Sequence, residues 1–161
     1  VLALSGIDAH LSWPNDVLVE DRKLSGILVE SGQLGDRSWA VVGIGINVDQ
    51  IRFEGDYRRA PTSLMLEAGR PFDTGEVLAT VCSEFDRLYA SWSANGNGPI
   101  LTAWRLSTRM FGRYITIEES GRRREGRAVD LGQDGSLMIE LADGSVERLL
   151  AGDVSLREER Q

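Results

Sequence analysis

The alternation of apolar and polar residues predicts a β-hairpin early in the chain. Two β-prone runs, residues 17–20 and 24–30, flank the polar residues 21–23, which is the spacing of paired antiparallel strands. Residues 40–48 then form a nearly continuous apolar run. Such runs are typical of strands covered on both faces, so we expect this strand in the middle of a sheet.

Helical periodicity replaces this pattern after residue 60. Residues 62–68 predict a short helix, residues 76–92 a long one and residues 100–106 a third, because apolar positions recur there at helical spacing. We expect the apolar face of the long helix to pack on the sheet, with Cys82 in the core. Chain breakers between residues 49 and 73 predict an irregular connection of the kind that often carries function.

The carboxy-terminal part of the chain predicts short strands separated by turns. These runs are residues 114–118, 127–131, 136–141, 146–150 and 154–156. Asp-Gly pairs at 134–135 and 143–144 favour tight hairpins, and the spacing is typical of a small barrel. We expect an α+β fold, with a mixed sheet and helices in residues 1–111 and a barrel in residues 112–161.

Composition narrows the class of protein. Of the 161 residues, 42% are hydrophobic and 27% are charged, the balance of a globular protein with a packed core. No apolar run reaches the roughly 20 residues of a membrane span, and no secretion signal is recognisable, so we expect a cytoplasmic protein. The net charge of -7 argues against a nucleic-acid partner, and the basic run at residues 122–124 is predicted to be a solvated hairpin tip.

The small number of cysteine and histidine residues and the first residues of the chain lead to two further expectations. With one cysteine, Cys82, and one histidine, His10, an internal disulfide is excluded and a zinc site lacks ligands, so any metal would be bound by oxygen atoms. The chain begins at Val1 to Leu4 with an apolar segment that has neither a cap nor an initiator methionine. Either a methionine was removed, or the chain is a truncated piece, which is the reading that we favour.

Two segments carry side chains suited to binding. Gly43 and Gly45 would let a ligand approach the backbone, and Asn47 adds an amide that can meet a phosphate or a metal-bound water. The segment matches neither a P-loop nor a dinucleotide fingerprint, and a tightly packed strand is the alternative. Lys23, the sole lysine of the chain, lies close to Gly26, where its ammonium could hold a carboxylate and an α-phosphate together. An ordinary surface lysine is the alternative there.

These segments together resemble the biotin protein ligases in order and spacing. The matching segments are residues 13–17 (Trp-Pro-Asn-Asp-Val), 21–30 (Asp-Arg-Lys-Leu-Ser-Gly-Ile-Leu-Val-Glu), 43–48 (Gly-Ile-Gly-Ile-Asn-Val) and 62–64 (Thr-Ser-Leu). With the helical stretch and the closing barrel, the resemblance covers essentially the whole chain. It implies a class II synthetase-like biotin/lipoate ligase catalytic fold, its amino-terminal part missing, followed by an SH3-like barrel.

The resemblance also implies a reaction and its residues. In that family biotin and ATP condense to biotinyl-5'-adenylate, and a lysine of the biotin carboxyl carrier protein of an acyl-CoA carboxylase then attacks the mixed anhydride. Lys23 matches the catalytic lysine, which bridges the biotin carboxylate and the α-phosphate. The implied biotin-binding residues are Lys23, Gly26, Ile27, Gly43 and Gly45, and the implied ATP-binding residues are Asn15, Asp16, Lys23 and Asn47. Magnesium would come with ATP, near Asn47, and homodimers occur in the family.

Two departures from the family pattern bear on activity. Ser12 stands where the family usually has a lysine, and the arginine-rich glycine loop that folds over the ligands would lie upstream of Val1. We therefore predict that the isolated chain is an inactive, poorly soluble fragment with exposed sheet surface. A lipoate ligase or octanoyltransferase is the alternative enzyme, and a non-catalytic interaction module with a degenerate site is the alternative from another class.

Overall fold

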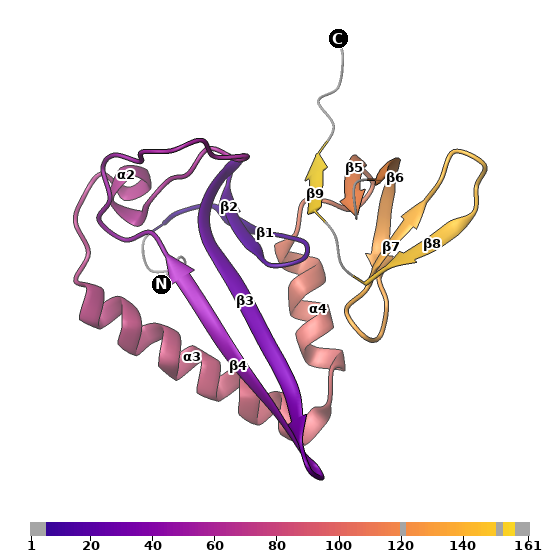
Figure 1. The fold of residues 1–161 in the computed structure, drawn as a ribbon. Helices are drawn as coiled ribbons and strands as arrows, with labels where there is room; N and C mark the ends of the chain where they lie inside the picture. Colours follow the sequence, from indigo (N-terminus) through magenta and orange to yellow (C-terminus); the bar gives the residue numbers. More distant parts are fainter. Residues whose placement is uncertain (1–5, 120–121, 151–152, 157–161) are drawn as a thin grey trace. The chain divides into compact units, whose positions relative to one another are not determined.

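The computed structural model describes residues 6–119, 122–150 and 153–156 and contains two β-sheets and several helices, which confirms the predicted α+β class (Figure 1). The chain divides into two compact units. The first unit comprises residues 1–10 and 15–83, and the second comprises residues 11–14 and 84–161. The apolar start at Val1 to Leu4 lies outside the described residues, and a domain limit at residue 112 stays a prediction.

The first sheet has the strand order β1-β2-β3-β4. Its strands are β1 (Ala9–Ser12), β2 (Asp16–Val19), β3 (Arg22–Leu34) and β4 (Arg37–Ile46). The predicted hairpin is formed by β2 and β3, which pair antiparallel, and β3 and β4 continue as a long antiparallel ribbon (Figure 1). The expectation of a mixed sheet is thus not met by these strand pairs, which are antiparallel.

The position predicted for residues 40–48 was wrong. Strand β4 is the last strand of its sheet, and Trp39, Val41, Val42 and Ile44 are 47%, 60%, 41% and 41% exposed. The rule that continuous apolar runs lie in central strands assumes layers on both faces. The described part of the chain supplies no such layers over β4, so its apolar side chains remain at the surface.

Burial in the first unit is concentrated where the strands meet helix α2 (Leu64–Ala68). The buried cluster there consists of Val19, Leu24, Val48, Leu64 and Val77. Ser63 caps α2 by accepting a hydrogen bond from the Leu66 amide at 3.2 Å, which satisfies one of the amides left open at a helix start. The short helix predicted at residues 62–68 is confirmed.

Helix α3 (Thr74–Asn95) confirms the long predicted helix but not its packing. Phe85, Tyr89 and Trp92 are 45%, 55% and 46% exposed, and Cys82, expected in the core, is exposed. The aromatic side chains pack on one another instead, with ring centroids 6.1 Å apart for Phe85 and Tyr89 and 5.5 Å for Tyr89 and Trp92. Helical periodicity therefore identified an apolar face that no described sheet covers.

The second unit combines helix α4 (Gly98–Ser107) with a sheet of order β8-β7-β6-β5-β9. Its strands are β5 (Tyr114–Glu119), β6 (Arg122–Leu131), β7 (Leu137–Glu140), β8 (Val146–Leu149) and β9 (Asp153–Leu156). The predicted strands are confirmed, and among the described residues no pair joins β8 to β9 to close the sheet. The buried cluster of this unit includes Trp13, Ile115, Ile117, Leu137 and Ile139.

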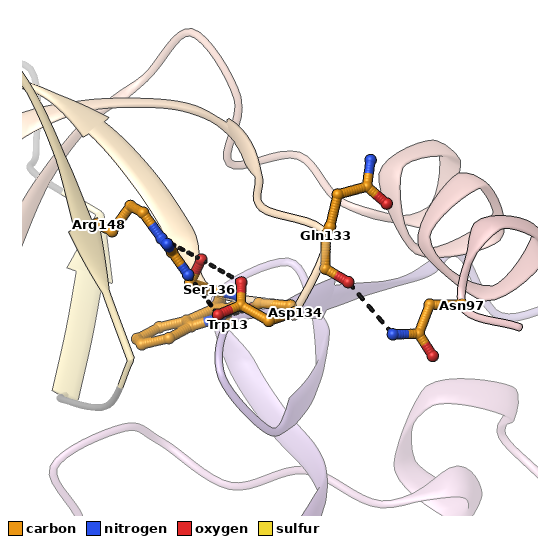
Figure 2. Close-up of polar contacts among 7 residues, drawn as sticks. Trp13, Asn97, Gln133, Asp134, Ser136 and Arg148 are labelled. Carbon is orange, nitrogen blue, oxygen red and sulfur yellow. Dashed lines mark hydrogen bonds and ion pairs between the residues drawn. The ribbon is translucent and has the colours of Figure 1, made fainter.

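The turn between β6 and β7 is held by several polar contacts within the second unit (Figure 2). The Trp13 indole donates to the Gly135 carbonyl at 3.0 Å, and the Asn97 amide donates to the Gln133 carbonyl at 3.2 Å. Arg148 contacts Asp134 and Ser136. The hydroxyl of Ser136 donates to Asp134 at 2.7 Å and, with the Ser136 amide and Arg148, lowers the pKa of that carboxyl.

Two other predictions concern the surface of the chain. The hairpin tip predicted at residues 122–124 was wrong, because these residues belong to strand β6 and pair with β5. Within β6, Arg124 pairs with Glu147 at 2.7 Å. No helix in the described ranges is long and apolar enough to cross a membrane.

Candidate functional site

A pocket of about 440 Å³ lies on the first sheet and is lined by segments singled out in the sequence. The lining residues are Asn15, Lys23, Gly26, Ile27, Leu28, Gly43, Ile44 and Gly45. All of the residues expected at a biotin site line it, together with Asn15 from the expected ATP site. Asp16 and Asn47 are not lining residues. Leu28 and Ile44 line the pocket although neither was predicted; they are the strand neighbours of the predicted residues.

Strand register explains why distant glycines share this pocket. In the β3–β4 ribbon Gly26 is opposite Gly45, Ile27 is opposite Ile44 and Leu28 is opposite Gly43. Directly opposed residues on antiparallel strands lie on the same face of the sheet. Three positions without side chains therefore gather on adjoining strands and leave the backbone open to a ligand.

The space around Gly43 and Gly45 bears on the two explanations of these glycines. A Cβ atom on Gly43 would come no closer than 3.7 Å to the Leu28 carbonyl oxygen, and one on Gly45 no closer than 3.9 Å to the Gly26 carbonyl oxygen. Both are ordinary van der Waals distances. Packing among the described residues therefore does not require glycine at either position, and their role at a binding site stays a prediction.

Lys23 is held by its backbone at the start of β3. Its amide donates to the Ala60 carbonyl at 2.8 Å, and its carbonyl accepts from the Thr62 amide at 2.9 Å. The side chain reaches Asp16, with 2.7 Å between Nζ and Oδ1. The long loop before α2 thus holds the backbone of the lysine that the sequence singled out.

The two predicted asparagines are both engaged with the backbone. The side-chain amide of Asn15 donates to the Ile27 carbonyl at 2.6 Å, and the backbone carbonyl of Asn15 accepts from the Ile27 amide at 2.9 Å. Asn47 donates through Nδ2 to the carbonyls of Thr62 at 2.8 Å and Lys23 at 3.4 Å. Both side-chain amides therefore brace the backbone near the pocket, and the side-chain oxygen is the atom that each could still offer a ligand.

The rest of the Trp-Pro-Asn-Asp segment has a different place. Trp13 is 5% exposed and belongs to the buried cluster of the second unit, where its amide also donates to the Met110 sulfur at 3.1 Å. Ser12, which stands in place of the family's usual lysine, is 7% exposed. Turn chemistry alone does not account for this segment. Trp13 belongs to the buried cluster of the second unit, and Asn15 lines the pocket of the first unit.

Two family models match the chain in the order expected. The model described as "Biotin/lipoate A/B protein ligase family" matches residues 2–47, and the one described as "Biotin protein ligase C terminal domain" matches residues 110–157. The first range contains every lining residue of the pocket. The second contains all five strands of the second sheet.

Curated relatives and solved structures agree with these matches. The bifunctional ligase/repressor BirA of Escherichia coli is 30% identical over 98% of this chain and 49% of its own length. A biotin--[acetyl-CoA-carboxylase] ligase of Mycobacterium tuberculosis is 30% identical over 96% of this chain and 55% of its own length. The chain thus spans about half the length of these relatives.

The solved structure of a biotin protein ligase from Aquifex aeolicus in complex with biotin and ATP is similar with a TM-score of 0.82 and 26% identity, covering 98% of this chain and 66% of that one. The similarity therefore extends over both units of the chain. From the two family models, the relatives and this fold, we conclude that the chain belongs to the biotin protein ligase family.

Proposed function

We propose that this chain carries the biotin- and ATP-binding pocket of a ligase that makes biotinyl-5'-adenylate and transfers biotin to a lysine of a carrier protein of an acyl-CoA carboxylase. The observation that carries the proposal is the fixed Lys23 ammonium beside a pocket lined by Gly26, Gly43 and Gly45. An ammonium group beside exposed backbone can bind two anionic groups, here the biotin carboxylate and the α-phosphate of ATP, and bring them together. A cytoplasmic location is part of the same proposal.

The first step would bring a biotin carboxylate oxygen to the α-phosphorus of ATP. The bond from the α-phosphorus to the bridging oxygen breaks, and pyrophosphate leaves. Negative charge accumulates on the α-phosphate oxygens in the transition state, where the Lys23 ammonium would stabilise it. In the second step the amine of the carrier lysine attacks the anhydride carbonyl, AMP leaves, and the amine proton is released.

Magnesium fits the site as an ion carried by the nucleotide. Among the described residues no three Asp, Glu, His or Cys side chains gather to form a protein cage. Asn47 uses Nδ2 for two carbonyls, so its Oδ1 is the atom suited to a hard cation, which prefers oxygen ligands and usually keeps several waters. When bound, the ion would neutralise charge on the phosphates.

A lipoate ligase or octanoyltransferase is the second candidate, because the matching amino-terminal family includes lipoate enzymes. The match of residues 110–157 to a biotin protein ligase domain favours biotin. Competition between biotin and lipoate for the pocket separates the two. Tighter binding of lipoate would replace the proposal with this candidate.

The direct test is biotinylation of a carrier lysine with biotin, ATP and magnesium. It is run on this chain, on a version extended at its amino end by the corresponding segment of the Escherichia coli relative, and on Lys23→Ala in both. We expect label transfer only in the extended, Lys23-containing protein. Label transfer that survives Lys23→Ala would contradict the role of the lysine, and silence in every protein would favour a degenerate interaction module.

Gly45→Ala tests the pocket itself. The new methyl group meets no protein atom closer than 3.9 Å, so the protein should fold normally while the methyl group occupies the pocket wall. Overpacking costs about 1–3 kcal/mol. Calorimetry should therefore show that Gly45→Ala binds biotin roughly tenfold more weakly than the unmodified chain, or more weakly still. Ser38→Ala, on the same strand outside the pocket, is the matched control, and equal binding by both variants would exclude this wall as the site.

A further inference from the structure

Asp16 and Lys23 form an ion pair at the edge of the pocket. The distance from Nζ to Oδ1 is 2.7 Å, and the side chains are 41% exposed for Lys23 and 23% for Asp16. The Oδ1 atom is shielded from solvent and accepts no hydrogen bond of good geometry from the described residues. The lysine ammonium is therefore the group that balances this carboxylate oxygen.

A β-bulge directs Lys23 toward Asp16. Asp16 is opposite Gly26 and Val17 is opposite Ser25, but the register then shifts and Lys23 is opposite Leu18. Without the shift Lys23 would be opposite Val19, on the other face of the sheet, since side chains alternate along a strand. Bulges re-aim side chains in this way and are common near active sites.

Gly26 provides the space that this pair occupies. A Cβ atom on Gly26 would lie 2.9 Å from Cε and 3.0 Å from Nζ of Lys23, and 3.5 Å from Oδ1 of Asp16. Its cross-strand partner Gly45 has no such neighbour, with the nearest atom at 3.9 Å. The two glycines thus have different surroundings: Gly45 borders open space, and Gly26 borders the Lys23 side chain.

We propose that Asp16 is a positioning residue, which holds the Lys23 ammonium across Gly26 and acts on the reaction through the lysine instead of by binding the nucleotide. A lysine side chain loses rotamer entropy when it is fixed, and the ion pair takes part of that loss before substrates bind. The ammonium has three N–H donors, so it can stay paired with Asp16 while it donates a hydrogen bond to a ligand oxygen. The inference rests on the proposed function of the pocket.

The test uses the fact that Lys23 is the sole lysine of the chain. Selective ¹³C labelling of lysine gives one set of side-chain signals, and a held side chain shows two distinct Hε shifts, whereas a freely rotating one shows a single averaged shift. We expect two shifts in the unmodified chain and in Gly45→Ala, and one averaged shift in Asp16→Asn and Gly26→Ala. Asp16→Glu, which keeps the charge, should restore part of the difference, a result that a purely structural role for Asp16 does not predict.

Adenylation kinetics give the second readout, in the extended protein described above. Asp16→Asn should lower kcat for biotin-dependent pyrophosphate exchange by more than it raises KM for ATP, with partial recovery in Asp16→Glu. Two distinct Hε shifts in a folded Asp16→Asn protein would overturn the positioning role, as would a change confined to KM for ATP. If the shifts collapse as expected but no protein shows biotin-dependent exchange, Asp16 still holds Lys23 and it is the proposed ligase function that fails.

Discussion

The two compact units differ in how they use their apolar residues. The second unit buries Ile115, Ile117, Leu137 and Ile139 with 0% exposure each. In the first unit the buried hydrophobic cluster lies beside α2, while Leu28, on the ribbon that carries the pocket, is 64% exposed. The well-packed unit lacks the predicted site, and the predicted site lies on the sparsely covered sheet. The proposed site of this chain thus lies where packing is least complete.

The sharpest way to break this comparison is to remove one core side chain from each unit. Leu64 and Leu137 are both 0% exposed, so Leu64→Ala and Leu137→Ala should each cost roughly 2–5 kcal/mol in the free energy of unfolding. Amide hydrogen exchange should show that the first change loosens Leu24 and Asn47 and the second loosens β5 to β8. If both variants loosened the same amides, the two units would not be separate in stability.

A smaller effect is expected at the cap of α2, which anchors the first unit. Ser63 accepts from the Leu66 amide and donates to the Gln50 carbonyl at 2.6 Å. Removing such a cap costs about 1 kcal/mol, so Ser63→Ala should lower the unfolding free energy by about that amount in chemical denaturation. Ser93→Ala, on the exposed surface of α3, is the control and should change it by less than about 0.5 kcal/mol. Equal losses in both variants would mean that the cap adds nothing.

The smallest effect concerns the second unit in acid. The hydrogen bond from Arg105, at 2.5 Å, is the main cause that lowers the pKa of Asp130 below its usual 3.8. A lowered pKa in the folded state means stability that is present above pH 3.8 and lost as the pH falls through the folded-state pKa. The pair is half exposed, so the effect should stay below about 1 kcal/mol.

Melting temperatures at pH 5 and pH 2.5 measure this contribution. At pH 5 Asp130→Asn should melt below the unmodified chain, and at pH 2.5 the difference should shrink toward zero. A difference that is the same at both pH values would rule out the Arg105 pair as its source.

The sequence predicted which residues gather at the pocket better than it predicted how the surrounding elements pack. Lys23, Gly26, Gly43 and Gly45 meet because hairpin spacing determines the register of β3 and β4, and that spacing is visible in the sequence. The ion pair from Lys23 to Asp16 was not predicted, because it depends on a one-residue register shift that no residue pattern marks.

The errors in the fold share one physical cause. The apolar runs of β4 and α3 were predicted to be buried. Periodicity does identify the apolar face of an element. Whether a covering layer exists is decided by other parts of the protein. Exposed Trp39 and Cys82 show that the described part of the chain does not supply it.

The crossing of Lys23 over Gly26 also restricts the order in which this site can change by mutation. While the lysine lies beside Asp16, a side chain at position 26 would come within about 3 Å of its Cε and Nζ atoms, so the lysine would have to leave that place. Once the lysine is replaced by a short residue, that restriction ends. A lineage in which the site decays should therefore lose the lysine first and the glycine later, and a chain that keeps the glycine without the lysine would record the first stage of that loss.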